Sequence, residues 1–207
     1  MRLIETVRVR AGRAPLWDLH LTRLRRSALV LGIPLEPIEP PAGTERVVRL
    51  VASAGGIGRE DRPVAPVAAL SVAFSGVAHP GYPHKTDQRA HFDAALAEAC
   101  LDRADEALLS TESGWVAEGT FTALFWWDGA RLAAPPQELG ILPSVARARI
   151  AEISGGLVER RVDPRGLRGR PIFLANAARG IMEVASLHGE RVPRDQRTDA
   201  LARWFWP

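Results

Sequence analysis

The chain contains a single lysine, Lys85, although lysine and arginine together number 27 in its 207 residues. Arginine therefore supplies almost all of the positive charge. Arginine stays protonated in proteins, whereas the amine of lysine can lose its proton and attack a carbonyl group. The scarcity alone permits two interpretations of Lys85: a solvated surface residue left over in an arginine-rich chain, or a nucleophile whose task arginine cannot perform.

Cysteine is equally scarce, and Cys100 is the only one. A single cysteine excludes an internal disulfide and a cysteine-based metal site. Cys100 stands in the alanine-rich stretch "AALAEACL", where the helical pattern predicts a position in the core. The five histidines lack the spacing of metal ligands, so we expect no metal site.

Long apolar runs are also missing. No stretch approaches the roughly 20 residues that cross a bilayer, and the start "MRLIETVRVR" lacks the apolar core of a signal peptide. We therefore expect a soluble cytoplasmic protein with no membrane partner. The net charge is only +3 and the arginines are scattered without interleaved aromatic residues. This pattern argues against nucleic-acid binding and suits a small anionic ligand equally well.

The first part of the chain has the pattern of a strand followed by a helix. Residues 3–9 alternate and contain β-forming side chains, and apolar spacing predicts a helix over 17–31 that ends at a glycine. In this helix His20, Arg23 and Ser27 fall beside the apolar stripe. Arg23 could thus point from the edge of the helix into a cleft, whereas a solvated or salt-bridged arginine is the commoner case at such a position.

Two further strands are predicted at 46–53 and 67–74. The glycine cluster "GGIGREDRP" between them lacks the GxGxxG order of a dinucleotide site, and we interpret it as a hairpin loop. The segment 75–84 is rich in proline and glycine, as interdomain connections are. We therefore expect a smaller α/β domain over residues 1–80 and a larger α+β domain over residues 81–207.

The larger part mixes helices and strands. A helix is predicted after Lys85, followed by short strands and turns over 105–135 that suggest an antiparallel sheet. A second helix is predicted over 143–154, a pair of strands surrounds Asn176, and a last helix ends the chain. Because the blocks do not alternate strictly, the pattern favours an α+β fold over a doubly wound one.

Four motifs then occur in a specific order: Lys85 in "HKTDQR", Glu118 in "VAEGT", "LGILPSVAR" and "NAARGI". With these motifs the sequence resembles the class IV aminotransferase family, the fold-type IV pyridoxal-phosphate enzymes, over most of its length. The resemblance implies a two-domain α+β fold, pyridoxal 5'-phosphate as cofactor and a homodimer. The hairpin that usually precedes the first strand in this family is absent, so the N-terminal part is expected to be shortened.

The resemblance assigns three side chains to three ends of the cofactor. Lys85 corresponds to the lysine that holds the aldehyde as a Schiff base and then moves protons during catalysis. Glu118 corresponds to the carboxylate beside the pyridine nitrogen, where a negative charge favours the protonated ring. Arg23 corresponds to the arginine that pairs with the phosphate group.

The remaining motifs imply further contacts. Val145 and Ala146 would donate backbone N–H groups to the phosphate from the start of a helix, although Ala146 replaces the usual threonine. Asn176 and Ala177 match a turn that faces the cofactor, with Ala177 in place of a hydroxyl residue. Arg179 and Arg89 are the candidates for binding a substrate carboxylate, and Arg179 could equally be an exposed turn residue.

The lysine region bears on the reaction. Arg89 follows Lys85 by four residues, as in aminodeoxychorismate lyases, whereas Ala90 stands where branched-chain aminotransferases have tyrosine. The resemblance thus implies 4-amino-4-deoxychorismate lyase, which eliminates pyruvate to give p-aminobenzoate for folate biosynthesis. A class IV aminotransferase acting on an amino acid and a 2-oxo acid is the alternative. Alanine stands at positions 123, 146 and 177, where the family commonly has other residues. A degenerate cofactor-binding protein without activity is therefore the third alternative.

Overall fold

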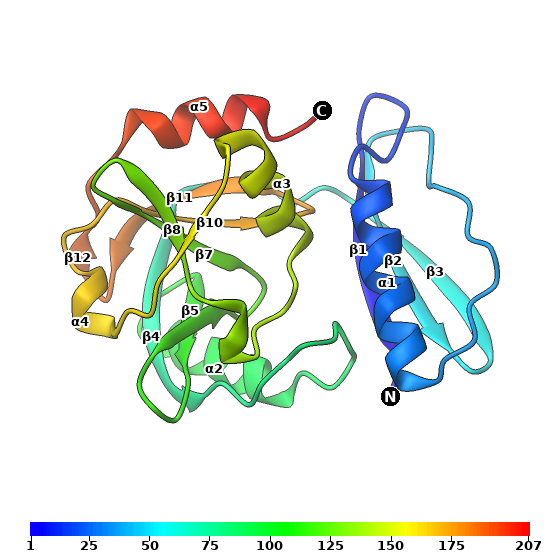
Figure 1. Cartoon of the computed structure of the whole chain (residues 1–207), viewed down its shortest axis with the longest axis horizontal. Helices are drawn as coiled ribbons and strands as arrows, with labels where there is room; N and C mark the ends of the chain where they lie inside the picture. Colours follow the sequence, from blue (N-terminus) through cyan, green and yellow to red (C-terminus); the bar gives the residue numbers. More distant parts are fainter.

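In a computed structural model of the protein, which describes all 207 residues, the chain forms two sheets joined by the segment 63–69. We call residues 1–62 the smaller subdomain and residues 70–207 the larger subdomain. The smaller one is built from β1 (Leu3–Val9), α1 (Trp17–Leu31), β2 (Arg46–Ser53) and β3 (Gly56–Arg62). Its three strands are antiparallel in the order β1-β2-β3, with α1 packed against β1. Figure 1 shows the two subdomains side by side.

Successive side chains of the first strand, β1, point to opposite faces of the sheet, as they do in any strand. One face contacts α1 and the other the larger subdomain. Leu3, Val7 and Val9 are buried on the side of α1. Arg8 lies on the other face, and its Nη1 donates a hydrogen bond to the carbonyl oxygen of Ala178 in the larger subdomain at 3.3 Å. One face of β1 therefore holds the smaller core while the other faces the larger subdomain.

The larger sheet has nine strands in the order β6-β5-β4-β11-β10-β7-β8-β9, with β12 paired to β11. Neighbouring strands are antiparallel except for the pairs β4–β5, β4–β11 and β8–β9. The strands are β4 (Leu70–Ala78), β5 (Glu106–Ser110), β6 (Val116–Gly119), β7 (Ala123–Asp128), β8 (Arg131–Ala134), β9 (Val158–Glu159), β10 (Ile172–Asn176), β11 (Gly180–Leu187) and β12 (Glu190–Arg191). The helices are α2 (Ala90–Leu101), the 3-10 helix η1 (Gln137–Leu139), α3 (Val145–Ser154), α4 (Pro164–Leu167) and α5 (Gln196–Trp204).

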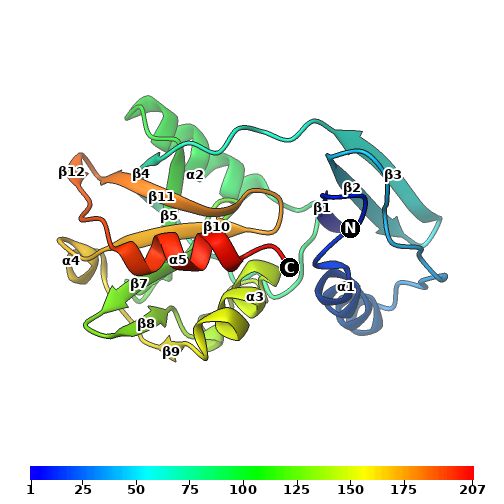
Figure 2. The ribbon, with the colours of Figure 1, turned by 90° about the horizontal axis from the view of Figure 1, so that it is seen from above.

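The larger sheet is packed on both faces. One face encloses a core that includes Trp126, Leu174 and Met182. The other face is covered by α2 over β4 and β5, and by α3 and α5 over β10 and β11. Figure 2 shows these helices at opposite sides of the larger subdomain, with α2 on one side and α3 with α5 on the other. Along β10 the alternation is clear, because Phe173 and Ala175 join the core beneath α3 while Leu174 joins the first core.

Hydrogen bonds to backbone carbonyl groups fix the seam between the subdomains. The N–H of Ile4 donates to the carbonyl oxygen of Lys85 at 2.8 Å, so the lysine segment lies directly against β1. At the other end of the seam, Nη2 of Arg13 donates to the carbonyl oxygen of Pro207 at 3.0 Å. The two subdomains are thereby joined at several points, with Lys85 between them.

Much of the predicted local structure is confirmed. The predicted strand at 3–9 and helix at 17–31 have the bounds observed for β1 and α1, and Gly32 ends the helix with a left-handed φ of 64°. The α+β class and the predicted helix that begins near residue 143 are confirmed as well. The sheet over 105–135 is antiparallel only within the pairs β5–β6 and β7–β8, since β5 also pairs in parallel with β4.

The hairpin loop predicted at "GGIGREDRP" is wrong, because this segment forms strand β3. It pairs with β2 from Ser53↔Gly56 to Val47↔Arg62. Nearly all of its side chains are exposed at the edge of the sheet, so the strand carries no hydrophobic alternation in its sequence. The next strand, β4, pairs with β5 and β11 in the larger sheet. The two sheets therefore separate within 63–69, earlier than the domain boundary predicted at residue 80.

The predicted burial of Cys100 is also wrong, because its side chain is exposed. The buried positions of α2 are Phe92, Ala95 and Ala99, and Cys100 falls outside this stripe. Alanine is small and common on both faces of this helix, so the sequence gives little contrast between its buried and exposed sides.

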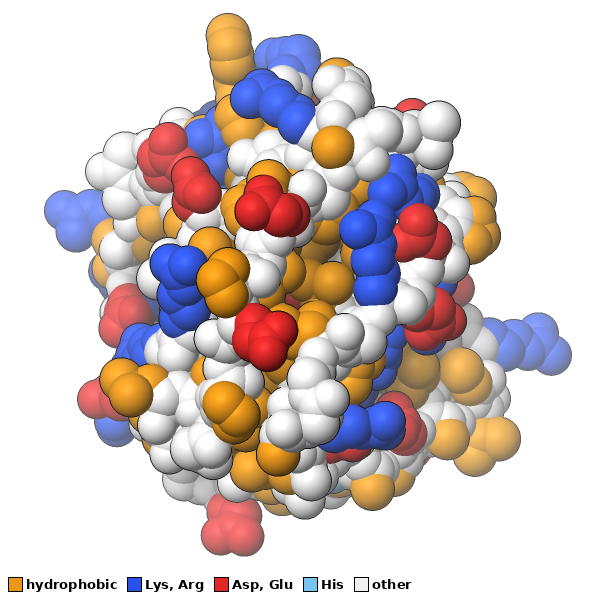
Figure 3. Space-filling view, turned by 90° about the vertical axis from the view of Figure 1, so that its right-hand side faces the viewer, with side chains coloured by type: hydrophobic (Ala, Val, Ile, Leu, Met, Phe, Trp, Pro, Cys, Tyr) orange, Lys and Arg blue, Asp and Glu red, His pale blue; other side chains and the backbone are white.

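Three further observations concern membrane spans, metal sites and the surface. No helix has both the length and the apolar character needed to pass through a membrane. No three or more histidine, cysteine, aspartate or glutamate side chains are grouped so that they could hold a metal ion. On the face that the smaller subdomain turns outward, acidic and basic side chains are interspersed with hydrophobic ones (Figure 3).

Candidate active site

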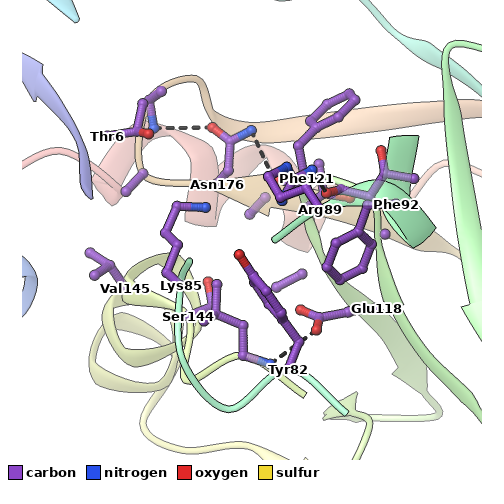
Figure 4. A pocket seen from close by; sticks show the side chains of 18 of the residues that line it. Thr6, Tyr82, Lys85, Arg89, Phe92, Glu118, Phe121, Ser144, Val145 and Asn176 are labelled. Atoms are coloured by element: carbon purple, nitrogen blue, oxygen red, sulfur yellow. Dashed lines mark hydrogen bonds between the residues drawn. The ribbon is translucent and has the colours of Figure 1, made fainter. Parts of the chain in front are cut away.

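A cavity at the seam between the subdomains contains the lone lysine (Figure 4). It is lined by residues of β1 and α1 from the smaller subdomain, and from the larger subdomain by the segment before α2, β6, the start of α3 and the turn after β10. Seven of the nine residues predicted from the sequence line it: Arg23, Lys85, Arg89, Glu118, Val145, Asn176 and Ala177. The other two, Ala146 and Arg179, lie outside the lining.

The amine of Lys85 has no partner and is accessible from the cavity, and the residue as a whole is half-buried. Its side chain takes part in none of the hydrogen bonds or ion pairs of the structure. Burial, and next the positive charge of Arg23, lower the pKa of the Lys85 amine from 10.5 to about 8. Near neutral pH a much larger fraction of this amine is therefore neutral than for an exposed lysine, which is the state a nucleophile requires.

The backbone beside Lys85 is fixed by Tyr82, the only tyrosine of the chain. The hydroxyl of Tyr82 donates to the carbonyl oxygen of Thr86 at 2.5 Å and accepts from the N–H of Thr86 at 2.7 Å. Its ring packs edge-on against Phe92, which also lines the cavity. These contacts, with the hydrogen bond from Ile4, hold the lysine segment from three directions.

Arg23 is oriented by a buried carboxylate. Its Nε and Nη2 donate to the two carboxylate oxygens of Glu5 at 2.9 Å and 2.6 Å, and its Nη1 donates to the carbonyl oxygen of Pro143 at 3.2 Å. His20 also contacts Glu5 through Nδ1 at 2.6 Å. A guanidinium has five N–H donors, so one on each terminal nitrogen of Arg23 remains free toward the cavity.

The pairing of Glu5 with Arg23 is expected to make folding stability depend on acid pH. Burial alone would raise the pKa of Glu5, but the Arg23 charge and the His20 hydrogen bond outweigh it and lower the pKa to about 2 from 4.5. Glu5→Gln should reduce the free energy of unfolding at pH 7 by about 3 kcal/mol. Because the folded-state pKa is depressed, this difference is present above pH 4.5 and is lost as the pH falls toward 2.

Urea unfolding of both proteins at pH 7 and pH 3 measures this effect. Glu45→Gln is the control, because Glu45 also pairs with an arginine, Arg8, but its side chain is 57% exposed. The control should change the unfolding free energy by less than about 1 kcal/mol. An effect of Glu5→Gln that is as large at pH 3 as at pH 7 would contradict the assignment.

Glu118 comes from β6 and is buried, with one oxygen engaged and one free. Its Oε1 lies 2.9 Å from Nε2 of His79 and accepts from the N–H of Leu142 at 3.0 Å. Oε2 has no hydrogen-bond partner in the protein. The carboxylate is thus held at one oxygen and can accept a hydrogen bond at the other.

The start of α3 supplies backbone donors. The hydroxyl of Ser144 caps the helix by accepting from the N–H of Arg147 at 3.3 Å. The N–H groups of Val145 and Ala146 have no acceptor, as expected in a first helical turn. The methyl group of Ala146 is fully buried in the core beneath α3, so only its backbone can face a ligand. Helix N-termini of this kind favour anions.

The turn after β10 is held by Asn176, whose Oδ1 accepts from the N–H groups of Ala178 and Arg179 at 3.0 Å and 2.8 Å. The guanidinium of Arg179 lies over the ring of Phe121 at 5.3 Å. Arg89 does line the cavity, and its Nη2 donates to the carbonyl oxygen of Thr120 at 2.6 Å. Of the two arginines predicted to bind substrate, the structure therefore places only Arg89 in the cavity wall.

The loop after β6 is organised by a buried glutamate that the sequence did not single out. Glu106 accepts hydrogen bonds from the hydroxyl groups of Thr120 and Thr122 at 2.5 Å and 2.8 Å, and burial raises the pKa of its carboxyl group. A Cβ at Gly119 would lie 2.2 Å from Oγ1 of Thr122. This close approach admits only glycine, which accounts for the glycine that follows Glu118.

Several lining or supporting residues were not predicted from the sequence: Glu5, Thr6, His79, Tyr82, Glu106 and Thr120. Two signals were available. Glu5 and Thr6 stand in the first strand, where a carboxylate on the buried side of an amphipathic strand demands a buried cation. Tyr82 is the chain's one tyrosine and precedes Lys85 by three residues. His79 and Glu106 act through contacts distant in sequence and had no such signal.

The sequence model of the family described as amino-transferase class IV matches residues 39–187. A search of curated proteins gave no match. Among solved structures, a proposed amino-acid aminotransferase from Mesorhizobium loti is 29% identical with a TM-score of 0.82, over 90% of this chain and 99% of that one.

Two further structures share the fold at lower identity. A proposed 4-amino-4-deoxychorismate lyase from Legionella pneumophila is 21% identical with a TM-score of 0.85, over 99% of this chain and 91% of that one. A branched-chain aminotransferase from Thermoproteus uzoniensis, solved with norvaline, is 20% identical with a TM-score of 0.86, over 99% of this chain and 84% of that one. At such identities the likeness shows the fold alone.

Proposed function

Because the chain belongs to the class IV aminotransferase family, we propose that it is a pyridoxal-phosphate-dependent lyase. Its substrate would be 4-amino-4-deoxychorismate, from which it eliminates pyruvate to give p-aminobenzoate. The observation that carries the proposal is the unpartnered amine of Lys85 in one cavity with Glu118 and Arg89. Enzymes of this family are lyases or aminotransferases, and Arg89 is the reason for choosing the lyase.

The groups in the cavity fit the cofactor of the family. An amine without a partner at Lys85 suits the aldehyde, and the free Oε2 of Glu118 suits a protonated ring nitrogen. The unused N–H groups of Val145 and Ala146, with the two left on Arg23, suit the phosphate. Each of the three ends of pyridoxal phosphate thus has a group of the required chemistry.

When bound, pyridoxal phosphate supplies an electron sink for the negative charge that develops on the substrate carbon. Lys85 would hold the cofactor through its aldehyde, because its amine is the only side-chain amine in the cavity. The amine of Lys85 could also accept a proton from the substrate, because a pKa of about 8 leaves it partly neutral at working pH. Glu118 would accept the hydrogen bond of the ring nitrogen at its free Oε2 and so favour the protonated ring.

In the proposed lyase reaction the proton that leaves the ring carbon bearing the amine goes to Lys85. The neighbouring carbon–oxygen bond breaks, enolpyruvate departs with the electron pair and takes up a proton, and the ring becomes aromatic. No oxidant or second substrate is needed. Arg89 supports this reading, since its guanidinium lines the cavity and keeps donors beyond the one given to Thr120. These donors suit one of the two substrate carboxylates.

An aminotransferase is the second candidate. It is favoured by the similarity to the Mesorhizobium loti protein, whose name describes an amino-acid aminotransferase. Both reactions use Lys85, Glu118 and the phosphate donors in the same way, so these residues do not separate them. A cofactor-binding protein without activity is the third candidate, because alanine occupies positions 123, 146 and 177.

Pyruvate release from 4-amino-4-deoxychorismate, without any added amino acceptor, tests the choice. The lyase forms pyruvate and p-aminobenzoate in equal amounts, and Arg89→Leu should raise the substrate KM by about tenfold or more through loss of a charged hydrogen bond. No pyruvate, together with conversion of the bound cofactor to its amine form by alanine or glutamate, identifies the aminotransferase. If neither pyruvate nor the amine form of the cofactor is formed, the protein is the inactive binding protein.

The proposal includes assembly as a homodimer, as the family resemblance implies. Size-exclusion chromatography with light scattering measures this directly. A mass near 45 kDa, twice the 22.5 kDa of one chain, is expected, and a monomer would contradict it.

A further inference from the structure

His79 contacts Oε1 of Glu118, the oxygen other than the free Oε2. Its side chain is completely buried, and its Nε2 is 2.9 Å from Oε1 of Glu118. The backbone N–H of His79 donates to the carbonyl oxygen of Ser110 at 2.7 Å, and its ring packs edge-on against Phe92. The imidazole is therefore fixed in position and faces the carboxylate from the end of β4.

The other ring nitrogen decides where the proton of His79 resides. The N–H of Gly81 donates to Nδ1 of His79 at 3.2 Å. A backbone N–H can only donate, so Nδ1 must be unprotonated. A neutral imidazole then carries its proton on Nε2. It follows that Nε2–H donates to Oε1 of Glu118 and that His79 carries no charge in this arrangement.

The glycine is required for this arrangement. Gly81 has a φ of 80°, a left-handed conformation that turns its N–H back toward the ring. The next N–H, that of Tyr82, donates to the carbonyl oxygen of Gly140 at 2.6 Å, which holds the turn in place. The segment before Lys85 therefore sets the tautomer of His79 as well as the position of the lysine.

The neutral donor has a definite effect on Glu118. Oε1 receives two hydrogen bonds, from His79 and from the N–H of Leu142, and both leave the negative charge of the carboxylate uncancelled. A protonated histidine at this distance would instead neutralise it. With Oε1 held by two donors, the charge and the free lone pairs of Oε2 are directed into the cavity.

We propose that His79 is a positioning residue that orients the Glu118 carboxylate toward the cofactor's ring nitrogen while leaving its charge intact. The proposal rests on the function proposed above, since it concerns how this chain holds pyridoxal phosphate. His79 does not line the cavity, so it acts on the site through Glu118.

The test compares the affinity of the full-length protein, freed of cofactor, for two ligands. One is pyridoxal phosphate, and the other is its 1-deaza analogue, in which carbon replaces the ring nitrogen. Titration is followed by cofactor absorbance and by quenching of tryptophan fluorescence. His79→Leu should weaken binding of pyridoxal phosphate about tenfold, as expected for a lost hydrogen bond to a charged group, and should leave the affinity for the analogue unchanged within about twofold.

Two matched variants complete the experiment. His79→Gln keeps a donor near Nε2 and should bind pyridoxal phosphate within about threefold of the parent. His91→Leu is the control, because the ring of His91 also packs on Phe92, at 4.2 Å, but its Nε2 has no partner. This control should bind both ligands as the parent does. If His79→Leu does not fold, His79→Asn, whose shorter amide does not reach Glu118, takes its place.

The outcomes separate the two proposals. If the parent binds no pyridoxal phosphate, the proposed function fails. If the parent binds it and His79→Leu weakens both ligands equally, His79 has only a structural role and the inference is overturned. An unchanged affinity of His79→Leu for pyridoxal phosphate overturns it as well.

Discussion

Replacement of Lys85 by arginine is expected to abolish catalysis as completely as replacement by alanine, with turnover reduced by about 10⁴-fold or more. Arginine preserves the positive charge and much of the length of the side chain. It cannot lose its proton at any working pH, and it cannot be attached to an aldehyde in the way an amine can. The equal loss in both variants would show that the neutral amine is what the site needs.

Steady-state assays of the two Lys85 variants beside the parent measure this. Arg131→Lys is the control, because Arg131 is exposed and the change gives the chain a second lysine away from the cavity. It should retain full activity. Activity in Lys85→Arg above about one hundredth of the parent would contradict the role of Lys85 as proton carrier.

The burial of Lys85 adds a pH dependence to the same prediction. The rate at which the cofactor-free parent takes up pyridoxal phosphate covalently should rise as the pH increases through about 8 and then level off. The amine is protonated and unreactive below this range and neutral above it. A midpoint near the ordinary lysine value of 10.5 would show that burial and Arg23 do not act on this amine.

Loss of the Glu118 carboxylate should have the second largest effect, a decrease in turnover of about 10²- to 10⁴-fold. Without a negative charge beside it, the ring nitrogen of the cofactor is less often protonated and withdraws electrons less strongly. Glu118→Gln should be as damaging as Glu118→Ala. Both His79 and Leu142 donate to Oε1, so the amide oxygen of glutamine takes that place and its NH₂ group faces the ring nitrogen.

Turnover and the absorbance of the bound cofactor together measure the effect of Glu118. Glu112→Gln is the control, since Glu112 is an exposed loop residue six positions earlier. Its activity should equal that of the parent. Near-normal turnover in Glu118→Gln would show that this position needs only a hydrogen-bonding side chain and no charge.

The elements that the sequence predicted well are those with a strong local pattern. Helix α1 has an apolar stripe and ends at Gly32 with a left-handed φ of 64°. Strand β3 has seven residues at an exposed edge and no apolar alternation, so its place in the sheet depends only on pairing with β2. Cys100 was misplaced because an alanine-rich helix leaves its faces hard to distinguish.

The site shows the same division between local and distant signals. Motifs located Lys85, Glu118 and Arg89, and the structure brings them together from separate elements. Arg179 lies in its motif but stacks on Phe121 outside the cavity wall, which no sequence pattern indicated. His79 is 39 residues from Glu118 in sequence, so their contact exists only through the pairing of strands β4, β5 and β6.

Pyridoxal phosphate is expected to be bound covalently at Lys85. The chain has one lysine, so the only other primary amine available for attachment is its N-terminus. Reduction of the cofactor-loaded protein with borohydride, followed by peptide mass spectrometry, distinguishes the two. We expect one modified peptide that contains Lys85, formed in proportion to the bound cofactor. A protein that takes up no cofactor, or one labelled only at the N-terminus, would contradict it.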